Sequence, residues 1–360
     1  MKKRVRIKDI ADRVGVSTGT VDRVLHNRGN VAADVKAKVL KAVDELGYER
    51  NHLASALAYN RTIKVAVLLP NPKMDPYWTQ TDNGVLKAAK SVQHYGLLID
   101  ITYFDLFDSN GFLGCAKKIL KDKPAAVLFP PIFVKEAKWL IQECDKLNIP
   151  YTMINTKLNE TNYLCYIGQD SYQSGILGAR LLNFGLNQGE AVCILNVDYS
   201  TKAAHHLLEK ERGFKDYFIK QGKNKINILR ADFESFNDNE LLKVFLANLL
   251  KNNPNLHGIF VTNSRVYKVV DALEGITNRS IKIVGFDLVD ANLRYLQENK
   301  IDFLINQNPH DQGHLGVMSI FKTLILKETV EQIQYLPLDI VVKENVKYYL
   351  KKQKQQELVL

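Results

Sequence analysis

The stretch "VGVSTGTVDRVLHNRGN", residues 14–30, decides how the front of the chain folds. Gly15 lies in a short break, and Ser17 after it is a favourable helix N-cap because its hydroxyl can accept a backbone N–H. Positions that recur at helical spacing follow, namely Thr20, Val21, Val24 and Leu25. The remaining positions can hydrogen-bond outward, namely Asp22, Arg23, His26, Asn27 and Arg28. The pattern predicts a short helix with one polar face that contacts another molecule.

Two more helices are expected around this one. The apolar spacing predicts helices over 8–14, 18–26 and 33–46, with Gly47 ending the third. So small a unit can close a core only with a few inward residues, which are Ile10, Val14, Val21, Leu25, Val39 and Val43. A helix, a tight turn and a polar helix predict a helix-turn-helix whose second helix enters the DNA major groove. A generic three-helix packing unit is the alternative.

The charge is unevenly distributed along the chain. The 360 residues carry a net charge of +10, and residues 1–61 hold 13 Lys and Arg against 7 Asp and Glu. The remaining residues hold 36 against 32. A small basic head on a nearly neutral body favours a polyanionic partner for the head, with a merely solvated basic face as the alternative.

The composition indicates a cytoplasmic globular protein with no cofactor. The start "MKKRVRIKDIADRVG" has no apolar run after its basic residues, and no stretch of about 20 apolar residues follows anywhere. The four cysteines are scattered without a CxxC pair, which predicts small buried residues. His310 and His314 could share a helical face, but no third metal ligand accompanies them. No nucleotide-binding or hydrolase motif occurs, so we expect neither a cofactor nor an enzyme.

From residue 63 onward, short apolar runs alternate with amphipathic segments. The expected strands are 63–69, 97–104, 125–129, 151–154, 191–196, 226–229, 258–262, 281–286 and 303–306. The expected helices between them include 79–95, 135–147, 170–184, 205–221, 238–251 and 266–274. Continuous apolar strands separated by helices predict doubly wound parallel sheets, and two sheets are favoured over one very wide sheet. Such sheets bind ligands beyond the carboxyl ends of their strands, so a cleft between two lobes is expected.

Several ordered motifs resemble one family. The run "IKDIADRVGVSTGTVDRVLHNRGNVAADVKAKVLKAVDELGY" (7–48), followed by "NHLASALA" (51–58), resembles the DNA-binding head and hinge of the lactose-repressor family of bacterial regulators. The stretch "IVGFDLVDANLRYLQENKIDFLINQNPHDQGHLG" (283–316) resembles a signature of that family's effector domain. The resemblance implies a fold like that of periplasmic sugar-binding proteins. It divides the chain into a head (1–50), a hinge (51–61), a two-lobed effector domain (62–345) and a polar tail (346–360), which we expect to be frayed, with a short interaction helix as the alternative.

The resemblance also assigns residues to DNA. Base reading is implied for Thr18, Gly19 and Arg23, since threonine can touch a thymine methyl and arginine can fork onto a guanine. Gly19 departs from the family, because it has no side chain to read with. Phosphate contacts are implied for Ser17, Thr20 and Asn27.

The hinge carries a further implied contact. Leu57 in "NHLASALA" is the family's apolar wedge in the minor groove. A plain linker helix packed on the body is the alternative. Arg50 departs from the pattern, because a proline usually precedes the asparagine.

Polar residues at successive strand ends form the candidate ligand site. Asn263, Asp287 and Gln307 each follow an expected strand, and Asp170 stands at the start of a helix. Together they favour a polar, sugar-like ligand, while capping or turn roles are the alternative for each one.

Two aromatic residues and one lysine complete this candidate site. Tyr77 and Trp78 can offer a flat surface for a ring, or pack in the core. Lys210 stands where the family usually has an arginine, and its ammonium cannot make the two parallel hydrogen bonds of a guanidinium.

The resemblance implies a dimeric repressor-like regulator that binds a two-fold operator and responds to a small molecule. A solute-binding protein without a regulatory role and an enzyme working in the cleft are the alternatives. No membrane partner is expected.

Overall fold

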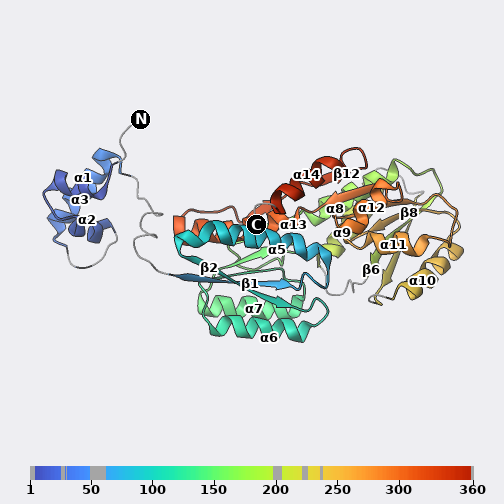
Figure 1. Cartoon of the computed structure of the whole chain (residues 1–360), viewed down its shortest axis with the longest axis horizontal. Helices are drawn as coiled ribbons and strands as arrows, with labels where there is room; N and C mark the ends of the chain where they lie inside the picture. Colours follow the sequence, from blue (N-terminus) through green and yellow to red (C-terminus); the bar gives the residue numbers. More distant parts are fainter. Residues whose placement is uncertain are drawn as a thin grey trace. The chain divides into compact units, whose positions relative to one another are not determined.

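The computed structural model divides the chain into two compact units, Met1–Tyr59 and Asn60–Leu360. The structure describes residues 5–25, 29, 31–48, 62–197, 205–220, 226–235 and 238–357, with side chains up to residue 351. Figure 1 shows the elements of each unit.

The first unit is the expected three-helix head. Its helices are α1 (Ile7–Val14), α2 (Thr18–Leu25) and α3 (Ala33–Leu46). Gly15 ends α1 in the left-handed conformation, with φ 72°. All six residues predicted to face inward lie in one cluster, where Ile10, Val21 and Val39 are fully buried. The core expected from the helical spacing is confirmed, and the helix bounds agree within one residue, with the predicted last residue of the second helix, His26, outside the described residues.

The second unit contains two six-stranded sheets, which confirms the two-sheet prediction. The first sheet has the order β11-β5-β4-β3-β1-β2, and all its pairs are parallel. Its strands are β1 (Ile63–Pro70), β2 (Leu97–Phe104), β3 (Ala126–Phe129), β4 (Tyr151–Ile154), β5 (Cys165–Gly168) and β11 (Ile333–Tyr335). Helices α5 (Pro76–Val92) and α13 (Pro309–Phe321) cover one face, and α6 (Ser109–Lys121) and α7 (Val134–Leu147) cover the other (Figure 1). We call this the first lobe.

The second sheet has the order β12-β10-β9-β8-β6-β7. Its strands are β6 (Ala191–Val197), β7 (Asn227–Phe233), β8 (Leu256–Val261), β9 (Lys282–Phe286), β10 (Phe303–Asn306) and β12 (Asp339–Val341). Only the β10–β12 pair in this sheet is antiparallel among the described strands. Helices α8 (Ser171–Asn183) and α9 (His205–Lys220) pack on one face. The other face carries α10 (Asn239–Asn252), α11 (Val266–Leu273), α12 (Asp290–Gln297) and α14 (Val346–Glu357). We call this the second lobe.

The chain passes between the lobes three times. The passages lie between β5 and α8, between β10 and α13, and between β11 and β12. Because the strands of each sheet end towards these passages, loops from both lobes meet there.

The frayed tail expected after residue 345 is wrong over Val346–Glu357, where the chain forms α14. Val346, Tyr349 and Leu350 pack against the apolar cluster of the second lobe. Their spacing places them on one face of the helix, and the many polar residues around them hid this face in the sequence.

The contact between α5 and α13 leaves no room for a side chain at Gly84. A Cβ added there would lie 1.9 Å from the backbone oxygen of His310, so a backbone would have to shift. We expect Gly84→Ala to lower the free energy of unfolding by about 1–3 kcal/mol, as overpacking usually does. Urea unfolding of the full chain measures the change.

Gly114→Ala is the matched control, because it also lies in a helix of the first lobe but has no atom within 4 Å of the added Cβ. We expect it to be neutral or more stable by up to about 1 kcal/mol. Equal losses in the two variants would contradict the tight α5–α13 contact.

Candidate functional site

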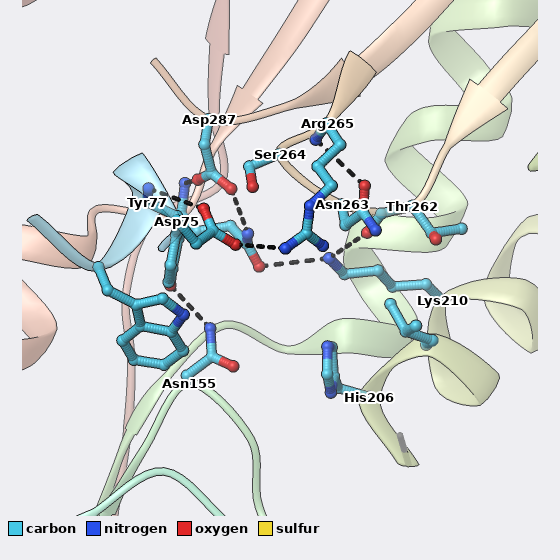
Figure 2. A pocket seen from close by; sticks show the side chains of 13 residues that line it. Asp75, Tyr77, Asn155, His206, Lys210, Thr262, Asn263, Ser264, Arg265 and Asp287 are labelled. Atoms are coloured by element: carbon cyan, nitrogen blue, oxygen red, sulfur yellow. Dashed lines mark hydrogen bonds and ion pairs between the residues drawn. The ribbon is translucent and has the colours of Figure 1, made fainter. Parts of the chain in front are cut away.

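A cavity of about 40 Å³ lies between the two lobes, at the carboxyl ends of their strands (Figure 2). The first lobe contributes Asp75, Tyr77, Trp78 and Asn155 to its lining. The second lobe and the passage after β10 contribute His206, Leu207, Lys210, Thr262, Asn263, Ser264, Arg265, Asp287 and Gln307. Most of these side chains can hydrogen-bond, so the cavity suits a polar molecule.

Six residues proposed from the sequence meet in this cavity, namely Tyr77, Trp78, Lys210, Asn263, Asp287 and Gln307. Asp170 does not join them. It is the N-cap of α8, where its carboxylate accepts the Gln173 N–H at 3.0 Å, and it lines a neighbouring cavity. The helix begins at the passage between the lobes, which carries Asp170 away from the other strand ends.

Gln307 connects the two oppositely charged residues of the second lobe. The Lys210 ammonium donates to Gln307 Oε1 at 3.2 Å and to the Thr262 carbonyl at 2.9 Å. The Gln307 side-chain amide in turn donates to Asp287 Oδ2 at 2.6 Å, and its backbone N–H donates to Asp287 Oδ1 at 3.1 Å. The amide therefore has one orientation, with its oxygen on the cation and its nitrogen on the carboxylate.

Burial disfavours the charged forms of Lys210 and Asp287. It lowers the pKa of Lys210, an effect that the Asp287 charge partly opposes. Burial likewise raises the pKa of Asp287, against the hydrogen bonds from Gln307 and the charge of Lys210. Asp287 also has a left-handed backbone, with φ 69°. A non-glycine residue in this region is uncommon, and such residues gather at functional sites.

An ion pair between the lobes crosses the cavity. Arg265 Nη2 lies 2.7 Å from Asp75 Oδ2, and the two side chains are only 4% and 8% exposed (Figure 2). Asp75 is also the N-cap of α5, where its other oxygen accepts the Tyr77 N–H at 3.0 Å. The contact fixes the start of α5 in the first lobe to the loop after β8 in the second.

Asn263 places this arginine. Its side-chain nitrogen donates to the Val197 carbonyl at 2.7 Å, and its oxygen accepts the Arg265 N–H at 3.1 Å. Both ends of the amide are therefore used to shape the loop after β8. Asn263 therefore has both roles that the sequence suggested, since it shapes a turn and also lines the cavity.

The two aromatic residues are buried rather than exposed to the cleft. Tyr77 and Trp78 are 5% and 3% exposed and meet edge to face, with ring centroids 5.0 Å apart. The Tyr77 hydroxyl accepts from the Asn155 side-chain amide at 2.7 Å. Burial, followed by the Asp287 charge, raises the pKa of Tyr77 well above its ordinary value, so this hydroxyl stays protonated. The two rings combine core packing with part of the cavity wall.

His206 makes a second contact between the lobes. Its Nδ1 lies 2.5 Å from the hydroxyl of Thr156, in the loop after β4. Burial, and then the nearby positive charges of Lys210 and His205, lower the pKa of His206 to about 3. The imidazole is therefore neutral near pH 7 and offers one donor and one acceptor.

Sequence reasoning missed several residues of the site, namely Asp75, Asn155, His206, Thr262, Ser264 and Arg265. A local signal was present for four of them. Asp75 precedes a proline at a helix start, and Thr262, Ser264 and Arg265 lie within two residues of the predicted Asn263. The partners of the ion pair are 190 residues apart, so the sequence could not pair them.

In the head, the three proposed base-reading residues Thr18, Gly19 and Arg23 are all exposed on α2. The Ser17 hydroxyl accepts the Thr20 N–H at 3.1 Å, as expected of an N-cap. Thr20 is half-buried. Asn27 and Leu57 lie outside the described residues.

None of the described helices combines the length and the apolar character that a membrane span needs. Across the same part of the chain, no group of three or more His, Cys, Asp or Glu is arranged to hold a metal ion.

Comparisons with known proteins agree with this architecture. Residues 65–328 match the family described as "Periplasmic binding protein domain", and residues 6–51 match "Bacterial regulatory proteins, lacI family". A ribose operon repressor of Halalkalibacterium halodurans is 25% identical over 346 residues, which cover 95% of this chain and 97% of that protein. A sucrose operon repressor of Lactococcus lactis subsp. lactis is 22% identical and covers 79% of this chain and 83% of its own.

One solved structure extends the likeness. The crystal structure of a candidate LacI transcriptional regulator from Bacteroides fragilis superposes with a TM-score of 0.72 and 26% identity, over 80% of this chain and 99% of that one. A helix-turn-helix head followed by two sheet lobes defines a ligand-binding transcriptional regulator. The chain belongs to the lacI family of bacterial regulatory proteins and carries its periplasmic binding protein domain.

The buried charges of the second lobe give a testable stability effect. We expect Lys210→Met to lower the free energy of unfolding by about 3–5 kcal/mol, because it leaves the Asp287 carboxylate buried without its cation. Adding Asp287→Asn should recover most of the loss, since asparagine tolerates the left-handed backbone and carries no charge. Urea unfolding of the single and double variants measures both effects.

The deficit of Lys210→Met should also depend on pH. Burial raises the pKa of Asp287 above its unfolded value, so the folded state binds the proton more tightly. Lowering the pH towards 5 should therefore reduce the deficit as the carboxyl takes up a proton. A deficit that is independent of pH, or a double variant no more stable than the single one, would contradict the charge coupling.

Proposed function

We propose that the protein binds a two-fold symmetric operator as a dimer, and that a small sugar-like ligand between the lobes changes its operator affinity. The proposal includes cytoplasmic regulation by residues 1–50, a DNA-dependent hinge at 51–61 with Leu57 in the minor groove, and effector sensing by the two lobes. The relatives named for ribose and sucrose operons favour a sugar as the ligand.

One observation supports this proposal most strongly. The cavity between the lobes holds two carboxylates, Asp75 and Asp287, and two cations, Lys210 and Arg265. All four are buried and engaged within the protein. Because these charges already balance, an ionic ligand would leave one of them uncompensated, whereas a neutral ligand with several hydroxyls can join the network.

The ion pair suggests how ligand binding reaches the head. Asp75 and Arg265 belong to different lobes, so any ligand that replaces or reinforces their contact changes the balance between lobe arrangements. A changed lobe arrangement alters the separation of the two hinge segments in a dimer. Operator affinity and ligand affinity are then coupled, and each must change the other by the same factor.

The proposed role of Arg23 is tested on a duplex selected from a random DNA pool. We expect Arg23→Ala to weaken binding to this duplex by roughly 1–3 kcal/mol, because a forked contact to a guanine is lost, and to spare binding to unrelated DNA. Fluorescence anisotropy measures both affinities. Lys41→Ala is the matched control, since it removes one exposed positive charge from α3 of the same head.

If Arg23→Ala and Lys41→Ala weakened binding to all duplexes equally, Arg23 would be a phosphate contact and the base-reading role would be wrong.

The effector proposal is tested by titrating pentoses, hexoses and disaccharides into the full chain by calorimetry. We expect one of them to bind and to change the affinity for the selected duplex. Asp287→Asn should lower the affinity for that sugar by about ten-fold or more, because a hydrogen bond to a charged group contributes about 1.5–3 kcal/mol. Asp100→Asn, on the exposed edge of the first sheet, is the control.

Unchanged sugar affinity in Asp287→Asn would remove this residue from the ligand site. A sugar that binds without any effect on the DNA affinity would contradict the regulatory coupling.

A further inference from the structure

A second cavity of about 110 Å³ lies beside the first. The loop after β4, the ends of β5 and β11, and the starts of α8 and α9 surround it. His206 lines both cavities. Both cavities are smaller than the roughly 300–1,000 Å³ that is usual for small-molecule sites, so a ring-sized unit can enter either one only when the lobes part.

A buried acceptor without a partner marks this second cavity. Gln169 is 4% exposed, and its side-chain nitrogen donates to the Asn306 carbonyl at 2.8 Å. Its Oε1 has no hydrogen-bond partner in the described part of the chain, although Gln169 lines the cavity. An unsatisfied buried acceptor costs about 1–3 kcal/mol, so a donor supplied by a ligand would remove a penalty that the protein alone leaves.

The lining of the second cavity is chemically specific. Among the described residues, its lining contains the rings of Tyr166, Tyr172 and Tyr335 and no aliphatic side chain. Lys157 Nζ lies 5.9 Å from the ring centroids of both Tyr166 and Tyr335. Aromatic faces beside amide and charged groups suit a ring that has apolar faces and a hydroxylated rim, which describes a carbohydrate unit.

Carboxylates in the same cavity are already partly engaged. Asp170 uses one oxygen to cap α8, and Glu209 pairs with Arg212 at 2.7 Å. Neither is an isolated negative charge that would call for a cationic ligand. A neutral hydroxylated ligand fits both this cavity and the first one.

The contact between His206 and Thr156 lies beside both cavities, because His206 lines each of them. Thr156 belongs to the first lobe and His206 to the second, as Asp75 and Arg265 do at the first cavity. Parting of the lobes breaks both contacts at once. An extended ligand that reaches both cavities would therefore enter only when the lobes part.

We propose that the effector is a carbohydrate of at least two ring units, with one unit in the first cavity and a second on Gln169, Lys157 and the tyrosines. This inference rests on the proposed function and specifies the ligand class of its site. Asp170, proposed from the sequence for ligand binding, then has its place at this second unit.

The test compares the full chain with Tyr335→Ala and Lys157→Ala, two partly exposed residues of the second cavity. Glucose, galactose, ribose, maltose, lactose, cellobiose and sucrose are titrated by calorimetry. Tyr103→Ala is the control, because Tyr103 lies on the opposite edge strand of the same sheet and is 41% exposed, against 49% for Tyr335.

We expect at least one disaccharide to bind roughly ten-fold or more tightly than its constituent monosaccharides. The second ring unit adds hydrogen bonds in the second cavity, and one buried hydrogen bond is enough for a change of this size. Tyr335→Ala and Lys157→Ala should lower the affinity for the disaccharide and leave the affinities for monosaccharides unchanged. Tyr103→Ala should change neither.

Two outcomes would overturn the inference. If monosaccharides bind as tightly as disaccharides, or if both cavity variants keep full disaccharide affinity, the second unit is absent while the proposed sugar response stands. If no sugar of either size binds, the proposed function fails together with this inference.

Discussion

The cleft depends on the compensation of buried charge between residues that lie far apart in the sequence. Asp75 and Arg265 meet at 2.7 Å with almost no exposure to solvent. Removing either one would leave an uncompensated charge in a poorly hydrated site, which costs far more than an exposed pair contributes. The arrangement of the two lobes is therefore tied to this contact, and the residues around it are positioned to maintain it.

The neighbouring residues serve that constraint from both sides. Asn263 shapes the loop that carries Arg265, while Asp75 caps the helix that carries Tyr77 and Trp78. Gln307 lies where the chain leaves the second sheet, and it links Lys210 to Asp287. The same polar side chains thus shape loops, cap helices and line the cavity, so structural and ligand-facing roles are combined in single residues.

The sequence predicted the fold well where a pattern is local. The three head helices and nine strands of continuous apolar residues follow from spacing and composition, and β4 and β10 match their expected bounds. Strands β11 and β12 are three residues each, too short to give a pattern, and β5 was missed although it is as long as β4. Strand β11 is stabilised by pairing with β5, which is distant in sequence, and propensity does not encode such a pairing.

The site was predictable to a similar extent. Strand-end logic identified Asp287, Gln307 and Asn263, because parallel strands bring their carboxyl ends to one edge. Arg265 and His206 escaped it, since their partners come from the other lobe. Asp170 satisfied the same local pattern but lies one cavity away, because position along a sheet edge depends on strand order and not on spacing.

The path of the chain also sets the order in which the protein can be completed during synthesis. Helix α13, which covers one face of the first lobe, and β11, which closes the edge of its sheet, are translated only after β6 to β10 of the second lobe. The second lobe in turn waits for β12 and α14 at the end of the chain. The segment 63–168 therefore emerges from the ribosome with one sheet face covered only by α5, and α13 begins about 140 residues later, or roughly 7–30 s at ordinary elongation rates. During this interval the nascent first lobe is a natural substrate for chaperones.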